Sequence, residues 1–454
     1  MSQSTFTIGY VPCAKSSWAD ARLDDIRIHG LAILKEAMPD TTVAGGEKLI
    51  TTDQEAADLA ETLAQSQVDV LVVHFTTFAL GTIVPMLAKR LKVPVIFWSM
   101  PEPPMQGGRL SANSFCAVNM NAHTLWKLGH DYLHVHADID EVLLMLQGQL
   151  KVCACVKRLS QLKLGLVGNR VPGFYTSDAN ELLLRRELGV EIELITLYEL
   201  VELSRKIDPT LQQQGLVQLT QSASNNDASQ DELDKSAALY QAFMQLKDKY
   251  QLDSFAIRCW PEFGDLFGVG VCAVSSMLND IGILSGCEGD VYGTVTMAIQ
   301  HALSGNLPFF CDLISIDGEN NTGITWHCGA APQSLCSADT KPQLHKHSII
   351  DGGEKKGVTV EFPLKPGRVT IARLSENQTG DGYRMLITTG TAIQTPQLLR
   401  GNPLQIKFDV DLPTLAQTLV YQGFEHHFSV VHGEIGDQLV DLCRVMNIEP
   451  IVLN

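Results

Sequence analysis

The sequence predicts an α/β protein with two doubly wound, Rossmann-like parallel-sheet domains, followed by a C-terminal β-rich, barrel-like domain. Three observations support this fold class. In residues 1–160, and again in residues 161–340, nearly continuous apolar runs alternate with segments of helical periodicity. Such runs are typical of parallel strands that are covered on both faces. After a polar stretch at 337–357, short β-type runs separated by Pro, Gly, Asn and Asp predict antiparallel strands.

The first domain, residues 1–160, shows the alternation of strand and helix most clearly. Its predicted strands and helices are, in order, the strand 5–11, the helix 21–36, the strand 68–75, the helix 80–91 and the strand 93–98. The helix at 21–36 carries Leu23, Ile26, Leu31 and Leu34 at the spacing of one helix face. These elements predict a parallel sheet with helices on both sides.

The second domain, residues 161–340, repeats the same alternation. Its predicted elements are the strand 162–167, a turn at 168–170, the helix 180–188, the strand 191–197, the helix 236–250 and the strand 254–258. Residues 209–235 are rich in Gln, Ser, Asn and Asp, so we expect a solvated loop or a polar helix end there.

The third domain, residues 341–454, has a different texture. The predicted strands are 358–362, 368–374, 383–389 and 404–410, and a last strand covers 450–453. Before that strand, Ile435, Leu439, Leu442 and Met446 share one face of an amphipathic helix. This spacing of short strands predicts an antiparallel barrel or sandwich.

Composition excludes several classes of function. The 454 residues are 45% hydrophobic and 19% charged, and 34 Lys and Arg against 51 Asp and Glu give a net charge of −17. This charge argues against nucleic acid or an anionic membrane as the main partner. No apolar run is long enough to span a bilayer, and no secretory signal is recognisable at the start. With eleven cysteines in no regular framework, we expect a cytoplasmic protein with reduced thiols.

Two acidic residues stand at the ends of apolar runs. Glu288 follows the run 281–287, and Asp312 follows the run 307–311. Ligands bind at the carboxyl ends of strands in α/β sheets, so the two carboxylates predict a site for a hard cation or an acid/base pair. The alternative is that Glu288 or Asp312 only caps a following helix. We expect Asp290 to be structural, as the cap of a helix at 291–303.

Histidines form a second group of candidates. Glu425-His426-His427 lies near the C-terminus, and adjacent residues of an extended segment point to opposite faces, so only one of the two histidines should face a given site. The histidines of the first domain have only weak metal-binding spacing, and Cys153-Ala-Cys155 lacks the second pair that a zinc site needs. The histidines in question are His123, His130, His134 and His136.

These motifs resemble those of the L-fucose isomerase and L-arabinose isomerase superfamily of aldose–ketose isomerases. In fucose isomerases a Glu opens a Glu-Asn-Asp motif, an Asp follows a later apolar strand, and a His lies in a late Asn-His-Gly segment. Here Glu288-Gly289-Asp290, Asp312 and His427 correspond to them, with a spacing of 312 − 288 = 24 residues. The chain departs from the fucose branch in being shorter and in having His-His, as in the arabinose branch.

The resemblance implies a metal-dependent intramolecular oxidoreductase that acts through a cis-enediol or enediolate. Glu288, Asp312 and His427 would hold Mn²⁺ or another divalent cation, and the two carboxylates would also act as acid and base. The expected substrate contacts are His327, Trp260, Arg258, Trp326 and, after an opening strand at 8–12, Arg22. His327 occupies a stretch in which the arabinose branch has a metal ligand.

The resemblance further implies a sugar substrate and a homo-oligomer, a hexamer or smaller, with sites at subunit interfaces. In such an assembly Arg22 and residues near 113–121 would act on the neighbouring subunit's site. The sugar stays open between L-fucose, L-arabinose, a related deoxy sugar and a sulfonated hexose. A sulfonate would need a cluster of cations. The candidates are Lys15, Arg22, Arg109, Arg170 and Arg258.

Two other functions compete with the isomerase. Residues 268–273 match Gly-x-Gly-x-x-Ala, and Glu288 lies 20 residues beyond Gly268, as in an NAD-dependent oxidoreductase. The match is weak, since no strand directly precedes it. Two α/β domains also fit a non-catalytic sugar-binding protein, but that function would leave the acidic residues and the histidine unexplained.

Overall fold

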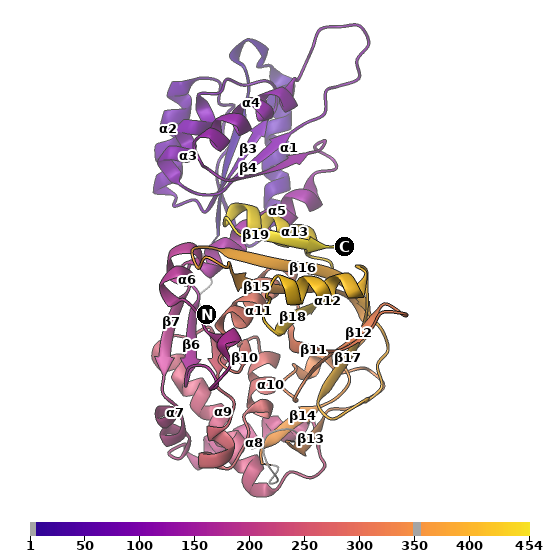
Figure 1. Ribbon diagram of the computed structural model, residues 1–454. Helices are drawn as coiled ribbons and strands as arrows, with labels where there is room; N and C mark the ends of the chain where they lie inside the picture. The colour runs from indigo at the N-terminus through magenta and orange to yellow at the C-terminus, as the bar shows by residue number, and fades with distance from the viewer. Residues whose placement is uncertain (1–5, 348–355) are drawn as a thin grey trace. The chain divides into compact units, whose positions relative to one another are not determined.

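The computed structural model describes residues 6–347 and 356–454, which form two compact units (Figure 1). The first unit is Met1–Lys157 with Gln438–Asn447, and the second is Arg158–Asp437 with Ile448–Asn454. Part of the polar stretch expected at 337–357, and the first residue of the strand expected at 5–11, lie outside the described residues. Within the described ranges, no helix combines the length and the apolar character needed to cross a membrane.

The first unit contains a five-stranded parallel sheet with the strand order β2-β1-β3-β4-β5. Its strands are β1 (Thr7–Cys13), β2 (Thr42–Gly45), β3 (Val70–Phe75), β4 (Val95–Ser99) and β5 (Tyr132–His136). Its helices are α1 (Ala21–Ala37), α2 (Asp53–Gln65), α3 (Ile83–Leu91), α4 (Ser114–Lys127), most of α5 (Leu143–Leu159) and most of α13 (Gly436–Val445), with a 3-10 turn at Ser16–Trp18. The central strands β1, β3 and β4 are buried throughout, as expected for a sheet covered on both faces.

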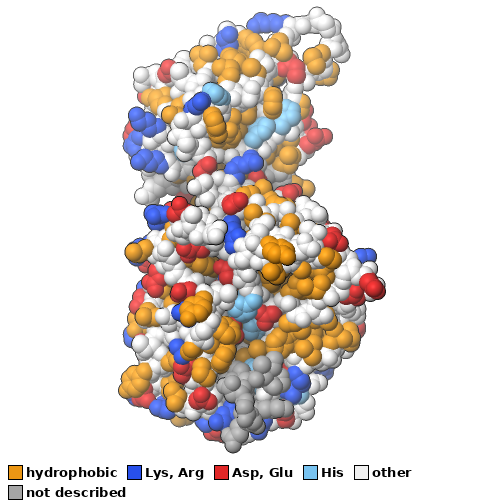
Figure 2. Space-filling model, in the orientation of Figure 1, with side chains coloured by type: hydrophobic (Ala, Val, Ile, Leu, Met, Phe, Trp, Pro, Cys, Tyr) orange, Lys and Arg blue, Asp and Glu red, His pale blue; other side chains and the backbone are white. Residues whose placement is uncertain are grey.

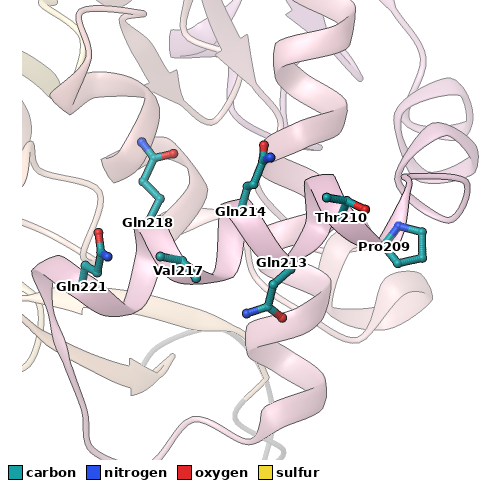
Figure 3. A pocket seen from close by; sticks show the side chains of 7 residues that line it. All are labelled: Pro209, Thr210, Gln213, Gln214, Val217, Gln218 and Gln221. Carbon is teal, nitrogen blue, oxygen red and sulfur yellow. The ribbon is translucent and has the colours of Figure 1, made fainter.

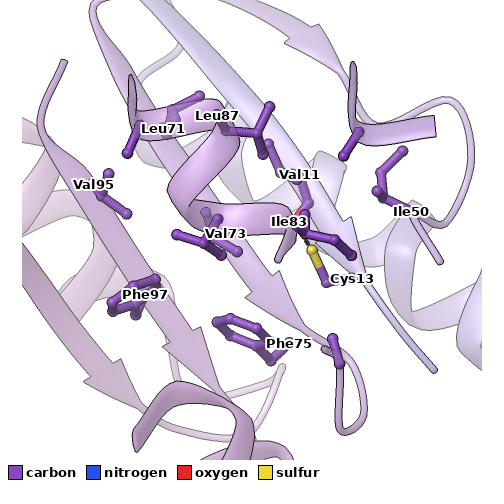
Figure 4. Close-up of a cluster of buried hydrophobic side chains, with 14 of the residues drawn as sticks. Val11, Cys13, Ile50, Leu71, Val73, Phe75, Ile83, Leu87, Val95 and Phe97 are labelled. Carbon is purple, nitrogen blue, oxygen red and sulfur yellow. Dashed lines mark hydrogen bonds between the residues drawn. The ribbon is translucent and has the colours of Figure 1, made fainter. Parts of the chain in front are cut away.

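Alternate residues of the central strands build the core of this unit (Figure 4). Val11, Val73 and Phe97 lie on one face of the sheet, where Ile83 and Leu87 of α3 pack against them. All five side chains are at most 2% exposed. The continuous apolar runs seen in the sequence therefore supply both faces of the sheet at once.

The second unit begins with a four-stranded parallel sheet of order β10-β9-β6-β7. Its strands are β6 (Lys163–Val167), β7 (Glu191–Ile195), β9 (Ser254–Ile257) and β10 (Ser285–Cys287). The accompanying helices are α6 (Glu181–Leu188), α7 (Leu197–Ser204), α8 (Pro209–Ser222), α9 (Gln230–Tyr250), α10 (Cys272–Asp280) and α11 (Val291–Ser304), with short helical turns at Tyr175–Ser177 and Phe263–Phe267. The two expected parallel-sheet α/β regions are confirmed.

The polar segment 209–235 is mostly helical, which corrects the expectation of a solvated loop or helix end. Asp208 caps α8 by accepting a hydrogen bond from Thr210 N, and Pro209 occupies the first turn, where its missing N–H costs nothing. Ser229 and Glu232 then form a capping box at the start of α9. The N-caps of α8 and α9 therefore stabilise helices in a segment whose polar composition is typical of a loop.

A closed six-stranded barrel completes the second unit. The strand order is β15-β18-β11-β12-β17-β16, and β16 pairs back to β15. Neighbouring strands around the ring are antiparallel, and β19 adds to β16 in parallel. The strands are β11 (Phe309–Asp317), β12 (Thr322–His327), β15 (Gly367–Glu376), β16 (Tyr383–Ala392), β17 (Asn402–Phe408), β18 (His427–His432) and β19 (Glu449–Leu453).

The second unit also contains several smaller elements. They are the helix α12 (Leu412–Tyr421), a 3-10 turn at Gln333–Leu335, and a three-stranded sheet of β8 (Ser224–Asn225), β13 (Gln343–Lys346) and β14 (Val358–Glu361). The expected barrel-like C-terminal domain is thus confirmed as a fold. Its first two strands, β11 and β12, come from the segment 161–340 that the sequence assigned to the preceding domain.

Candidate active site

The parallel sheet and the barrel of the second unit bring the predicted acidic residues and histidine together. Glu288 directly follows β10, at the carboxyl end of the parallel sheet. Asp312 lies in β11, directly opposite His427 of the antiparallel neighbour β18. Asp312 is therefore inside a barrel strand that continues to Asp317, and the expectation of two neighbouring strand ends in one sheet is wrong for it.

His427 lies between the two carboxylates and is within ligand distance of each, while Glu288 and Asp312 belong to two overlapping clusters that share His427. Glu288 Oε2 lies 3.5 Å from His427 Nε2, and His427 Nε2 lies 3.8 Å from Asp312 Oδ1. Ligand atoms that share a divalent ion, with bonds of about 2.1 Å, lie roughly 3–4 Å apart. In Figure 2 a small histidine surface adjoins an acidic surface between the positions labelled β10 and β18 in Figure 1.

The donor atoms fit a divalent cation. Asp312 Oδ1 is buried and has no hydrogen-bond partner among the described residues, which is costly for a carboxylate oxygen unless a cation is bound. Two overlapping groups have ligand atoms within 4.8 Å of one another, namely Glu288 with His426 and His427, and Asp312 with His327 and His427. Two carboxylates with imidazole nitrogens suit Mn²⁺ and similar ions.

A buried carboxylate orients His427. Asp290 Oδ2 lies 3.0 Å from His427 Nδ1, and both side chains are 1% exposed. Burial by itself would raise the pKa of Asp290, but the Arg373 guanidinium, 2.5 Å away, and His427 hold it well below its usual range. An ionised carboxylate can only accept, so His427 Nδ1 carries the hydrogen and Nε2 presents its lone pair to Glu288 and Asp312.

Asp290 also caps the next helix, as the sequence predicted. Its Oδ1 accepts a hydrogen bond of 2.8 Å from Gly293 N at the start of α11. The helix cap is thus Asp290, while the alternative capping role of Glu288 is wrong. The other oxygen of Asp290 pairs with Arg373, which is fully buried and also lies 3.3 Å from Glu425.

Glu288 is held by two neighbours. Trp260 Nε1 donates to its Oε1 at 3.1 Å, and His426 Nε2 lies 3.2 Å from its Oε2. Burial by itself would raise the pKa of Glu288, but the His426 hydrogen bond and the nearby His427 lower it below its usual value. The carboxylate is therefore ionised and positioned at neutral pH.

Both histidines of the His426-His427 pair face the site, which corrects the expectation that only one could. Their ring centroids lie 3.9 Å apart, and both rings contact Glu288. The alternation rule fails because β18 begins at His427, so His426 belongs to the preceding turn. Burial would lower the pKa of His426, but Glu288 and Asp312 raise it.

His327 lies beside this cluster at the end of β12. Its ring centroid is 5.8 Å from that of His427, and Trp326 stacks against it with an interplanar angle of 16°. Trp326 is itself buried and donates to the Arg400 carbonyl at 2.7 Å. Trp326 therefore supports His327, and His327 is the side chain of this pair that has a ligand atom within range of Asp312 and His427.

The two predicted arginine contacts, Arg258 and Arg22, have different surroundings. Arg258 forms a bidentate ion pair with Glu262, with Nε 2.9 Å from Oε2, and its Nη1 lies 3.5 Å from the Gly168 carbonyl. It therefore braces the loop after β6. Arg22 lies in the first unit, where it is exposed and 4.0 Å from Asp20.

Two side chains beside the candidate site, Phe174 and Thr176, were not predicted from the sequence. Phe174 packs edge-on against Trp260 and His426, with centroids 5.5 Å and 5.6 Å away, and Thr176 Oγ1 lies 3.1 Å from His426 Nδ1. Both residues belong to the loop between β6 and α6. The position of this loop after a parallel strand was the only signal available, since strand ends carry ligand sites.

Other candidate clusters have different surroundings. The surface hollow along α8 has lining residues without a carboxylate, imidazole or thiol (Figure 3), and these residues are Pro209, Thr210, Gln213, Gln214, Val217, Gln218 and Gln221. Ser99 Oγ joins His134 and His136 at 2.8 Å each, as a hydrogen-bonded pair on β5. Cys153 and Cys155 are buried in α5, as expected of core residues.

The Gly-x-Gly-x-x-Ala match lacks the structure of a dinucleotide site. Gly268 ends the helical turn Phe263–Phe267, and the next helix, α10, begins at Cys272. The strand β9 ends at Ile257, well before the first glycine. The glycines therefore do not form the tight strand-to-helix turn that a pyrophosphate requires.

Comparison with known proteins agrees with the fold. Residues 9–160 match the fucose/sulfoquinovose isomerase N-terminal domain, and residues 325–453 match the L-fucose isomerase C-terminal domain. A sulfoquinovose isomerase of Priestia aryabhattai is 31% identical over 450 residues, which is 98% of each chain. One of Alkalicoccus urumqiensis is 29% identical over 98% of this chain and 99% of its own, and one of Clostridium sp. strain MSTE9 is 29% identical over 90% and 91%.

Fold, site and relatives together define an aldose–ketose isomerase that acts on a sugar. The chain belongs to the fucose/sulfoquinovose isomerase family. The resemblance found in the sequence is thereby confirmed, and the NAD-dependent oxidoreductase and the non-catalytic sugar-binding protein are set aside.

Proposed function

We propose that the chain interconverts sulfoquinovose and the corresponding ketose, with a divalent cation, Mn²⁺ in particular, as its cofactor. The relatives that cover nearly the whole chain are named as sulfoquinovose isomerases. The single observation that supports the metal dependence is that His427 lies 3.5 Å from Glu288 and 3.8 Å from Asp312, at the centre of two overlapping clusters of possible metal ligands. A sulfonated hexose is also one of the substrates that the sequence left open.

The chemistry requires a proton to move between C1 and C2 of an open-chain sugar. A bound cation would supply electrostatic stabilisation of the negative charge that develops on the two neighbouring oxygens. Glu288 takes the C2 proton of the aldose and returns it to C1, so that the reaction passes through a cis-enediolate. Trp260 and His426 hold both oxygens of this carboxylate in place while it does so.

We assign the second proton transfer, between O1 and O2, to Asp312. Its Oδ1 has no partner among the described side chains, so this oxygen is available to a substrate hydroxyl or to the cation. Asp290 and Arg373 keep His427 in one tautomer and orientation, and contact neither the sugar nor the reacting atoms. Phe174 and Trp260 form an apolar wall for the carbon chain of the sugar.

The test is isomerisation of sulfoquinovose in deuterated water by protein loaded with Mn²⁺. Transfer through an exchangeable carboxyl group should place solvent deuterium on C1 of the ketose, visible by mass spectrometry. Glu288→Gln keeps the shape of the side chain and should lower kcat by about 10²- to 10⁴-fold, because the proton carrier is lost.

Glu319→Gln, at an exposed position after β11, is the matched control and should leave kcat unchanged. Removal of the cation with a chelator should abolish turnover, and added Mn²⁺ should restore it. Full activity of Glu288→Gln, or of the chelated protein, contradicts the proposed mechanism.

A further inference from the structure

The loop between β6 and α6 is fixed against the turn that carries Glu288. Gly289 has a φ of +75°, and a Cβ at this position would lie 2.5 Å from the Asn169 carbonyl oxygen and 2.9 Å from Arg170 Cα. Asn169 itself is left-handed, with a φ of 64°, and its side chain accepts from Arg170 N at 2.8 Å. The backbone of Arg170 therefore lies in direct contact with the turn after Glu288.

The same loop forms one wall of the site. Phe174 packs against Trp260 and His426, and Thr176 contacts His426, so two residues that hold Glu288 are also held by this loop. Arg170 belongs to the same loop, four residues before Phe174. Its guanidinium lies 4.7 Å from the Tyr175 ring centroid, and this stacking on a planar ring limits where the charge can go.

Arg170 differs from the other arginines around the site in how its charge is balanced. Arg373 is buried between Asp290 and Glu425, and Arg258 is clamped by both oxygens of Glu262. Among the described residues, Arg170 has one carboxylate neighbour, Asp178, at 3.8 Å, and that carboxylate is itself 67% exposed. An exposed pair at this distance is weak, so the Arg170 fork can be taken by another anion.

An anionic substrate would need such a cation. The site already holds the carboxylates of Glu288 and Asp312, in a chain of net charge −17. A sulfonate entering this field is repelled unless a positive group meets it at the rim. A sulfonate offers three oxygens in a geometry that the planar guanidinium can bind through two parallel hydrogen bonds.

We propose that Arg170 binds the sulfonate of the substrate and thereby sets the preference for an anionic sugar over a neutral one. This inference rests on the proposed function, since it assumes that the sugar bound at Glu288, Asp312 and His427 is sulfonated. Arg170 acts on binding and takes no part in the proton transfer, so its effect belongs to KM.

The test compares sulfoquinovose with quinovose, which is the same sugar without the sulfonate. Arg170→Met should raise KM for sulfoquinovose about 10- to 100-fold, as expected for loss of a charged hydrogen-bonded contact, and leave kcat within about threefold. The inhibition constant of quinovose, measured in competition, should not change. Arg170→Lys keeps the positive charge but loses the planar pair of donors, so its KM for sulfoquinovose should lie between those of the wild-type protein and Arg170→Met.

Two controls separate charge recognition from a structural effect. Arg185→Met removes an exposed arginine of α6 that pairs with Glu191, and should leave both constants unchanged. Added salt should raise KM for sulfoquinovose in the wild-type protein and have a much smaller effect in Arg170→Met, because the attraction between two charges is screened.

Two outcomes overturn the inference while leaving the isomerase function in place. One is an unchanged KM in Arg170→Met, and the other is an equal loss for sulfoquinovose and quinovose, which would make Arg170 a support of the loop. If the wild-type protein isomerises neutral aldoses but not sulfoquinovose, the proposed substrate fails and the inference with it.

Discussion

At the scale of single residues, the site depends on a buried pair of opposite charges that touches no substrate. Asp290 and Arg373 are 1% and 0% exposed, and their charges offset each other behind His427. Such a pair is a weak source of stability, but removing one partner leaves a charge buried without its counterpart. The pair is therefore best understood as a support for the orientation of His427.

Asp290→Asn should destabilise the protein by about 3 kcal/mol, since Arg373 then retains only the longer contact with Glu425. Chemical denaturation followed by circular dichroism measures this loss. The double variant Asp290→Asn/Arg373→Met should recover part of the stability, because the fully buried guanidinium is removed and only Glu425, which is 14% exposed, loses its partner.

Asp317→Asn serves as the control, since Asp317 accepts hydrogen bonds only within the exposed turn after β11. If the double variant were no more stable than Asp290→Asn, the two residues would not act as a pair.

At the scale of elements, the contact between two turns decides the shape of the site. The turn after β10 and the loop after β6 meet at Gly289, where no side chain has room. Gly305, at the end of α11, has a similar φ of +73° but nothing within 4 Å of its Cβ position. The two glycines therefore separate the cost of the backbone conformation from the cost of crowding.

Gly305→Ala should cost about 1 kcal/mol, from the left-handed conformation alone, and should leave kcat unchanged. Gly289→Ala adds a clash with the backbone of Asn169 and Arg170, so it should be more destabilising and should also lower kcat/KM, as the wall formed by Phe174 moves away from Glu288. Thermal unfolding and steady-state kinetics of both variants check this. Equal effects of the two substitutions would contradict a role for the contact.

At the scale of the whole molecule, the proposed cation site belongs to one of two compact units. All three proposed ligands lie in the second unit, and the ends of the first unit are joined to it by the chain near residues 157 and 438–447. A ligand that binds only the folded form of one unit stabilises that unit by mass action.

Scanning calorimetry should therefore resolve two transitions, of which Mn²⁺ raises one and leaves the other unchanged. A chelator should reverse the shift, and Glu288→Gln should reduce it, while Glu319→Gln should retain it. An equal shift of both transitions, or one that survives in Glu288→Gln, would contradict a cation site confined to the second unit.

Some parts of the fold were accessible to sequence reasoning and others were not. The buried strands β1, β3 and β4 are continuous apolar runs and could be located directly. The edge strands β2 and β5 were missed, because each is short and only partly buried, so neither forms such a run. The helix α8 was missed because its caps, and not its polar interior, define it.

The candidate site divides in the same way. The sequence by itself marked Glu288 and Asp312 as candidates, because an acidic residue that ends an apolar run is a local feature, and the family resemblance added His427 and the isomerase chemistry. It also indicated that Asp290 caps a helix, which depends on the next three residues. Their roles in catalysis stay proposals.

Only the tertiary structure decided which side chains meet. That Asp312 lies opposite His427 depends on strands more than 100 residues apart pairing in a barrel, and that Asp290 orients His427 depends on a helix start lying against a barrel strand. The contact of Arg170 with the turn after Glu288 likewise joins two loops of the parallel sheet. Local sequence fixes hydrophobic period and caps, whereas long-range pairing follows from how the whole chain buries its apolar surface, and this is why the neighbours of each side chain could not be known in advance.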